Sequence, residues 1–150
     1  RTFLRGSIAT GAVGVAVGAG LLTPQMVLAA WPKAAFESTT VDDALTGLFG
    51  SKDHTGSDQI KIKAPDIAEN GAVVPISITT DLAADTISII ADKNASPLAA
   101  SFILGSDTEG FVSTRIKMGK TSSVIAVVKA NGKLYSTGKE VKVTIGGCGG

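Results

Sequence analysis

Short runs of alternating apolar and polar residues fill most of the stretch from residue 59 to residue 145. In the first run, Ile60 and Ile62 alternate with lysines, a pattern typical of a β-strand with one buried face. Turn-forming residues separate the runs, and Asn131-Gly132 is the strongest hairpin signal among them. The expected strands span residues 60–63, 72–80, 86–91, 99–104, 111–118, 122–130, 133–136 and 139–145.

The spacing of these runs predicts the fold class. Seven or eight short strands with no helical segments between them indicate an all-β protein, an immunoglobulin-like antiparallel β-sandwich rather than a parallel α/β sheet. Pro75 cannot donate a backbone hydrogen bond, so its strand is expected at a sheet edge or at a bulge. In the last strand Val141, Val143 and Ile145 should face the core.

One short helix is expected before the strands, between Thr40 and Gly50. Thr40 is a good N-cap, Asp42 and Asp43 suit the positive end of the helix dipole, and Gly50 can end the helix. These two aspartates are therefore interpreted as helix-end charges rather than acid/base catalysts. Four apolar residues on one helix face should pack on the sheet: Val41, Leu45, Leu48 and Phe49.

The first 30 residues are expected to be an export signal. Arg1 and Arg5 precede a stretch without charge that runs from residue 6 to residue 32. A core helix would show a polar face, and a membrane anchor would contain fewer glycines. The basic start, modestly apolar middle and small residues before Trp31 predict cleavage near residue 30 and a periplasmic location. The opening resembles the second half of a twin-arginine signal. After cleavage of the signal, the mature form is expected to contain no membrane span.

The mature chain is nearly neutral and contains one cysteine, Cys148, and one histidine, His54. Without residues 1–30, 12 basic residues face 13 acidic ones, which argues against nucleic acid as a partner. One thiol and one imidazole cannot form an internal disulfide or a protein-only tetrahedral zinc site, so no metal or cofactor is expected. His54 lies in a polar loop and is interpreted as a solvated surface residue, as are the strand-face charges Lys61, Lys63, Arg115 and Lys117.

The distinctive chemistry lies in residues 146–150, where Cys148 stands between Gly146-Gly147 and Gly149-Gly150. The glycines offer no apolar surface that would bury the thiol, and they leave the backbone free, so a flexible arm is expected. A merely frayed terminus remains an alternative. No residue of the arm lowers the thiol pKa or holds a base against it, so the arm should carry a group rather than catalyse a reaction.

At this point the sequence resembles a known family, SoxY, the sulfur carriers of the periplasmic thiosulfate-oxidising Sox system. The resemblance is carried by the terminal segment 141–150, by 64–75 and by 113–118. The chain departs from the family pattern at Ala95, where a proline is expected beside Asn94, and this affects only local turn geometry.

The resemblance implies a non-enzymatic carrier that holds sulfur intermediates covalently on Cys148. It also implies a SoxZ-like subunit as heterodimer partner. Transient partners would be a SoxXA-like c-type cytochrome that loads thiosulfate, a SoxB-like hydrolase that releases sulfate, and a SoxCD-like sulfur dehydrogenase. The expected domains are therefore the export signal 1–30, the sandwich 31–145 and the carrier arm 146–150.

Two other functions compete with this interpretation. A ubiquitin-like sulfur carrier also ends in Gly-Gly, but its activated group is the terminal carboxylate, and the cytosolic machinery it needs does not fit an exported chain. An exported immunoglobulin-like binding module whose thiol only tethers it to another chain is the second alternative.

Overall fold

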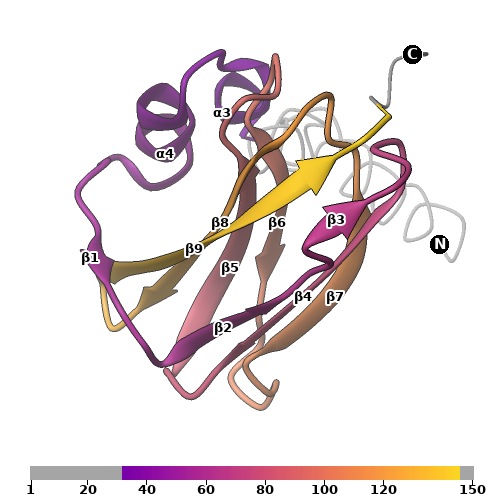
Figure 1. Cartoon of the computed structure of the whole chain (residues 1–150). Helices are drawn as coiled ribbons and strands as arrows, with labels where there is room; N and C mark the ends of the chain where they lie inside the picture. Colours follow the sequence, from indigo (N-terminus) through magenta and orange to yellow (C-terminus); the bar gives the residue numbers. More distant parts are fainter. Residues whose placement is uncertain (1–31, 146–150) are drawn as a thin grey trace, which may run out of the picture. The chain divides into compact units, whose positions relative to one another are not determined.

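Two β-sheets make up most of the part of the chain that the computed structural model describes, residues 32–145 (Figure 1). In the larger sheet the strand order is β1-β9-β8-β5-β6, and β3 also pairs with β9. In the smaller sheet it is β2-β4-β7. The larger sheet comprises β1 (Thr55–Gly56), β3 (Ile67–Ala68), β5 (Ala84–Ala91), β6 (Leu98–Ile103), β8 (Ser122–Ala130) and β9 (Lys133–Val143). The smaller comprises β2 (Ile60–Lys63), β4 (Val74–Thr80) and β7 (Phe111–Ile116).

The main core lies between the two sheets. Ile76 and Ile78 of β4 and Ile87 and Ile89 of β5 are fully buried there. The expected alternation holds along β7, where Val112 and Ile116 are buried while Ser113 and Arg115 are exposed. Each buried isoleucine contributes about 1.5–3 kcal/mol relative to an exposed one, so this layer supplies much of the folding free energy. The all-β sandwich predicted from the sequence is confirmed.

Two helices cover part of the outer face of the larger sheet: α3 (Lys33–Glu37) and α4 (Val41–Phe49). Leu45 of α4 packs with Ile90 and Val127 of the sheet in a second core, as its position on the apolar face predicts. Thr40 accepts a hydrogen bond from the Asp43 N–H at 3.1 Å, and Gly50 adopts the left-handed conformation that ends the helix. The helix boundaries and caps are therefore confirmed.

Some strand details differ from the expectations. Residues 133–136 and 139–145 are not two strands, because β9 runs unbroken from Lys133 to Val143, and Thr137 and Gly138 stay paired with β8. β1 and β3 are short additional strands parallel to β9. The Asn131-Gly132 hairpin is confirmed: both residues have positive φ, as a two-residue turn requires.

Pro75 lies in the middle strand of the smaller sheet, so an edge position for its strand is wrong. The pairing of β4 with β2 nevertheless extends only from Thr80 back to Ser77, opposite Lys63, and does not reach Pro75. Pro75 itself pairs only with Arg115 of β7. The missing N–H is tolerated because the neighbouring strand has already ended at this point.

Ile145 does not face the core as expected. Val141 is fully buried and Val143 half-buried, but 57% of Ile145 is exposed. The strand ends at Val143, and beyond it the in-and-out alternation of a paired strand no longer determines which way a side chain points. The predicted export signal and the predicted arm lie outside the described residues.

Candidate functional site

The predicted site residues, Cys148 and its flanking glycines Gly146, Gly147, Gly149 and Gly150, lie outside the described residues. What the structure describes is the segment from which they extend, the end of β9 followed by Thr144 and Ile145. We call residues 141–145 the arm root.

The short parallel strand β3 holds the arm root on one side. Lys142 pairs with Ile67, and Val143 pairs with Ala68. The Lys142 N–H donates to the Asp66 carbonyl at 3.0 Å, and the Thr144 N–H donates to the Ala68 carbonyl at 3.1 Å. These hydrogen bonds therefore hold the backbone as far as Thr144, one residue beyond the end of β9.

The loop that follows β3 completes this anchor. The Gly71 N–H donates to the Ile145 carbonyl at 2.9 Å, and the Gly71 carbonyl accepts from the Met118 N–H at 2.7 Å. Gly71 therefore connects the arm root to the turn between β7 and β8. That turn also reaches the root directly, because the Val143 N–H donates to the Thr121 hydroxyl at 2.9 Å.

Exposed apolar side chains gather on the segments that meet at this anchor. Ile67 of β3 is 57% exposed, and Val73 in the following loop is 52% exposed. Together with Ile145 they leave apolar surface beside the start of the arm. Lys139 on β9 makes an ion pair with Asp66 at 3.0 Å and donates to the Ala64 carbonyl at 2.6 Å, which ties the chain before β3 to β9.

The other candidates from the sequence lie elsewhere. His54 is exposed, as expected, but it also forms a hydrogen bond of 2.7 Å between its Nδ1 and the Ser136 hydroxyl, beside β1. Lys61, Lys63 and Arg115 are exposed strand residues. Among the residues that the structure describes, no group of three histidine, cysteine or acidic side chains is placed to hold a metal ion.

The first turn of α4 confirms the structural interpretation of its aspartates. Asp43 accepts a hydrogen bond from the Thr40 hydroxyl at 2.8 Å. Asp42 accepts one from Lys52 at 2.9 Å, and this bond and the negative charge raise the pKa of the lysine above its ordinary value of 10.5. Both aspartates are thus engaged in fixing the helix end and the loop after it.

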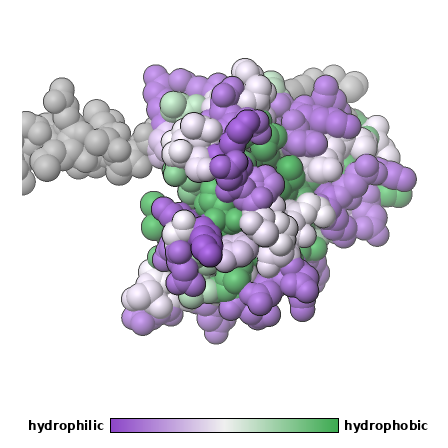
Figure 2. All heavy atoms as spheres, turned by 90° about the vertical axis from the view of Figure 1, so that its left-hand side faces the viewer, coloured by the Kyte–Doolittle hydropathy of each residue, from purple (hydrophilic) through white to green (hydrophobic). Residues whose placement is uncertain are grey.

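Figure 2 views the face that carries α4 and β1, where apolar patches alternate with hydrophilic side chains. A hollow of about 440 Å³ adjoins β1, with Phe49, His54 and Leu134 in its wall.

The fold and the arm root define a β-sandwich whose last strand leads into a cysteine-bearing glycine segment, and comparison with known proteins identifies the class. The family model described as sulfur oxidation protein SoxY matches residues 45–148, a range that includes Cys148. The chain belongs to the SoxY family. No match was found among the curated proteins.

A solved structure of a SoxY protein agrees with this assignment, and a second structure shares the fold. The sulfur carrier protein SoxY from Chlorobium limicola f thiosulfatophilum is 47% identical, with a TM-score of 0.64, and the match covers 71% of this chain and 97% of that one. A superoxide reductase (neelaredoxin) from Ignicoccus hospitalis is 18% identical, with a TM-score of 0.50, and the match covers 60% of this chain and 80% of that one. The second likeness shows a shared sandwich fold alone.

Sequence reasoning missed the residues that hold the arm root. The sequence does not mark Gly71 and Thr121 as site residues. Gly71 acts through its backbone and Thr121 through its hydroxyl, and only the tertiary structure brings these groups to the arm root. Only the loop position of Gly71, between two strand signals, marks it in the sequence.

In the described part of the chain, no helix is long and apolar enough to cross a membrane.

Proposed function

We propose that this protein is a covalent carrier in periplasmic sulfur oxidation, with the intermediates attached to Cys148. The observation that carries the proposal is the family match, which extends through Cys148, together with a solved relative that is named a sulfur carrier. The lone cysteine between two pairs of glycines is the group of this chain best suited to that task.

The chemistry needs a thiol and an external oxidant. Loading couples the Cys148 thiol to the outer sulfur of thiosulfate, forms one S–S bond, and releases one proton and two electrons to a c-type cytochrome. Hydrolysis then breaks the bond between the two sulfurs of the bound thiosulfate and releases sulfate, which leaves a persulfide on the cysteine. The chain itself supplies the attachment point, and the partner enzymes supply catalysis.

The anchor at the arm root suits such a carrier. A swinging group needs a fixed origin, and hydrogen bonds to Ala68 and Gly71 hold the backbone up to Ile145. Cys148 is three residues further on, so its thiol can reach on the order of 10 Å from that origin. Glycines on both sides keep the tether thin and free to rotate, which favours entry into narrow active sites.

The partners proposed are those of the Sox system. A SoxZ-like subunit would form the heterodimer, while a SoxXA-like cytochrome, a SoxB-like hydrolase and a SoxCD-like dehydrogenase would visit the arm in turn. The export signal in residues 1–30 would bring the chain to the periplasm, where these partners act.

Labelling with ³⁵S-thiosulfate in the presence of the oxidising partners separates the candidate functions. The native chain should take up label, the Cys148→Ser variant should not, and a chain lacking Gly149 and Gly150 should keep at least part of it. Loss of all label on removal of those two glycines, with Cys148 present, would instead indicate a carboxylate carrier. A stable disulfide dimer without any label would indicate a tethering module.

A further inference from the structure

Two of the three asparagines in the chain precede a glycine, in the pairs Asn70-Gly71 and Asn131-Gly132. An asparagine in this position loses its side-chain ammonia readily, because glycine has no Cβ to hinder the backbone nitrogen that attacks the side chain. The third asparagine, Asn94, precedes Ala95, whose methyl group hinders the same attack. The fold places the two Asn-Gly pairs in different surroundings.

The reaction, deamidation, needs a free side-chain amide and a free N–H on the following residue. Base removes the N–H proton, and the nitrogen attacks the asparagine Cγ and expels the side-chain nitrogen as ammonia. Water then opens the resulting succinimide ring at either carbonyl, which leaves aspartate or isoaspartate. Asparagine and water are thus converted to an acid and ammonia, with nothing oxidised or reduced. A hydrogen bond to either reacting group opposes the attack, because it must first be broken.

Both reacting groups of Asn70-Gly71 are hydrogen-bonded. The Gly71 N–H, which supplies the attacking nitrogen, donates to the Ile145 carbonyl at 2.9 Å. The Asn70 Oδ1 accepts the Ala72 N–H at 2.9 Å, which holds the side-chain amide in place. Gly71 is also buried. The same bonds that anchor the arm root therefore oppose deamidation at this pair.

Neither reacting group of Asn131-Gly132 is bonded. Asn131 is exposed, and within residues 32–145 its side chain forms no hydrogen bond and the Gly132 N–H donates none. Both residues have positive φ, so the turn must flex for the attack, but no bond of the reacting groups resists this motion. Lys129 and Lys133 line the same hollow as Gly132, and their positive charges favour the anionic nitrogen that attacks.

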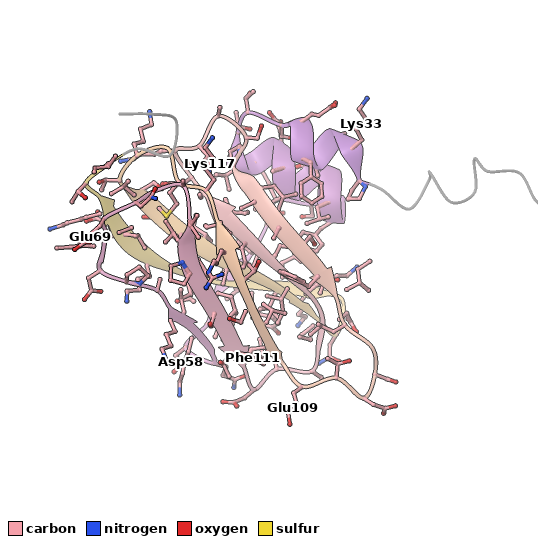
Figure 3. The ribbon with its side chains drawn as sticks, turned by 90° about the vertical axis from the view of Figure 1, so that its right-hand side faces the viewer. Lys33, Asp58, Glu69, Glu109, Phe111 and Lys117 are labelled. Carbon is pink, nitrogen blue, oxygen red and sulfur yellow. The ribbon has the colours of Figure 1, made fainter. Side chains whose placement is uncertain are left out.

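The two pairs lie near opposite ends of β9. Asn131-Gly132 immediately precedes the strand, whereas Gly71 is bonded to Ile145, two residues beyond its end. Figure 3 shows Glu69, the residue before Asn70-Gly71, at the same end of the sandwich as Lys117. A chemical change in the turn before β9 is thus remote from the arm root.

We propose that Asn131 is a site of spontaneous deamidation in the folded protein, and that the hydrogen bonds of the arm root protect Asn70 from the same reaction. The product places a negative charge beside Lys129 and Lys133. Its isoaspartate form also adds a carbon atom to the backbone of a two-residue turn, which the geometry of such a turn does not accommodate. The start of β9 therefore loosens, while the arm root keeps its bonds.

The test incubates the full chain in mildly alkaline buffer and follows the exchange of NH₂ for OH by mass spectrometry. Cleavage after glutamate separates the sites, because residues 110–140 contain Asn131 and residues 70–109 contain Asn70 and Asn94. Fragmentation of the second peptide distinguishes its two asparagines. In the folded chain Asn131 should react about tenfold faster than Asn70 or more, because two hydrogen bonds must break at Asn70. In urea both should react at similar rates, and Asn94 should stay slow.

Two variants serve as controls. Asn131→Gln keeps a side-chain amide but needs a larger ring, so residues 110–140 should lose the early mass gain. Asn70→Gln should leave that gain unchanged.

Either of two outcomes overturns the proposal: Asn70 reacts as fast as Asn131 or faster in the folded chain, or Asn131 reacts only in urea. The main comparison uses the native chain, so it does not depend on the folding of a variant. Labelling of Cys148 is measured separately, and neither outcome bears on the carrier function.

Discussion

The Gly71 N–H donates to the carbonyl of Ile145 at 2.9 Å, and this bond joins a loop in the first half of the sandwich to the last residue before the glycine arm. The carbonyl of the same glycine accepts from the Met118 N–H, so three distant segments meet at one residue. The proposed carrier arm requires a fixed origin, and backbone hydrogen bonds supply one in this protein. The side chain of Ile145 is 57% exposed, so its burial adds little.

The first prediction concerns the hydroxyl that holds the arm root. Thr121→Val keeps the side-chain shape but removes the acceptor for the Val143 N–H. We expect a loss of about 1–2 kcal/mol in the free energy of unfolding, because a half-buried donor is left without its partner. Hydrogen exchange of the Val143 amide should become faster. Thr121→Ser retains the acceptor and should stay close to the native chain, and equal protection of Val143 in both variants would contradict the role given to this hydroxyl.

A second prediction concerns Asn94, whose side chain joins two turns: it donates to the Lys117 carbonyl at 2.7 Å and accepts from the Gly119 N–H at 3.0 Å. Asn94→Ala removes both of its hydrogen bonds and should lower the free energy of unfolding by about 1–2 kcal/mol. The matched control is Lys93→Ala on the same turn, an exposed residue whose loss should change stability by less than about 0.5 kcal/mol. Denaturant unfolding measures both, and indistinguishable midpoints would show that Asn94 does not join the turns.

Close packing at the start of β7 gives a third prediction. A Cβ on Gly110 would collide with the Thr80 carbonyl oxygen, and the same pair is joined by the Thr80 N–H bond to the Gly110 carbonyl at 2.7 Å. Gly110→Ala should therefore destabilise the fold by about 1–3 kcal/mol. Gly56→Ala is the control, because nothing lies within 4 Å of a Cβ placed there. A thermal melt of Gly110→Ala that overlays the native one would refute this close approach.

The arm itself supplies a fourth prediction. Gly146→Pro with Gly147→Val restricts the backbone just beyond the anchor, so loading and unloading by the partner enzymes should slow several-fold or more while the melting temperature stays the same. Stopped-flow or quenched assays of sulfur transfer measure the effect. Unchanged transfer rates would show that rotation about these glycines is not used.

Much of the fold was predictable because its signals are local. Alternation in residues 111–118 and the Asn131-Gly132 turn depend on neighbours in sequence, and α4 carries its own caps at Thr40 and Gly50. The predicted break between residues 136 and 139 was wrong because pairing with β8 continues through Gly138. No local sequence pattern shows that residues 137 and 138 pair with β8.

The candidate site was also predictable only in part, because some of its residues are marked locally and others are brought together by the fold. Cys148 stands out in the sequence because it is the only cysteine and lies among glycines. The anchor at Gly71 and the hydrogen bond between Asn94 and Gly119 depend on strand order, which brings together residues far apart in the chain. The short helix α3 was also missed, since its five residues are too few to establish a helical period.

Attachment of the sulfur group to Cys148 is measured by the intact mass of the native chain after incubation with thiosulfate and the oxidising partners. We expect a mass increase of one S₂O₃ unit, because thiosulfate replaces the thiol hydrogen and the sulfonate is counted in its protonated form. Peptide digestion should map the added mass to Cys148, and a reducing agent should remove it. A chain whose mass stays unchanged while the partners consume thiosulfate, or whose added mass maps to any other residue, would contradict it.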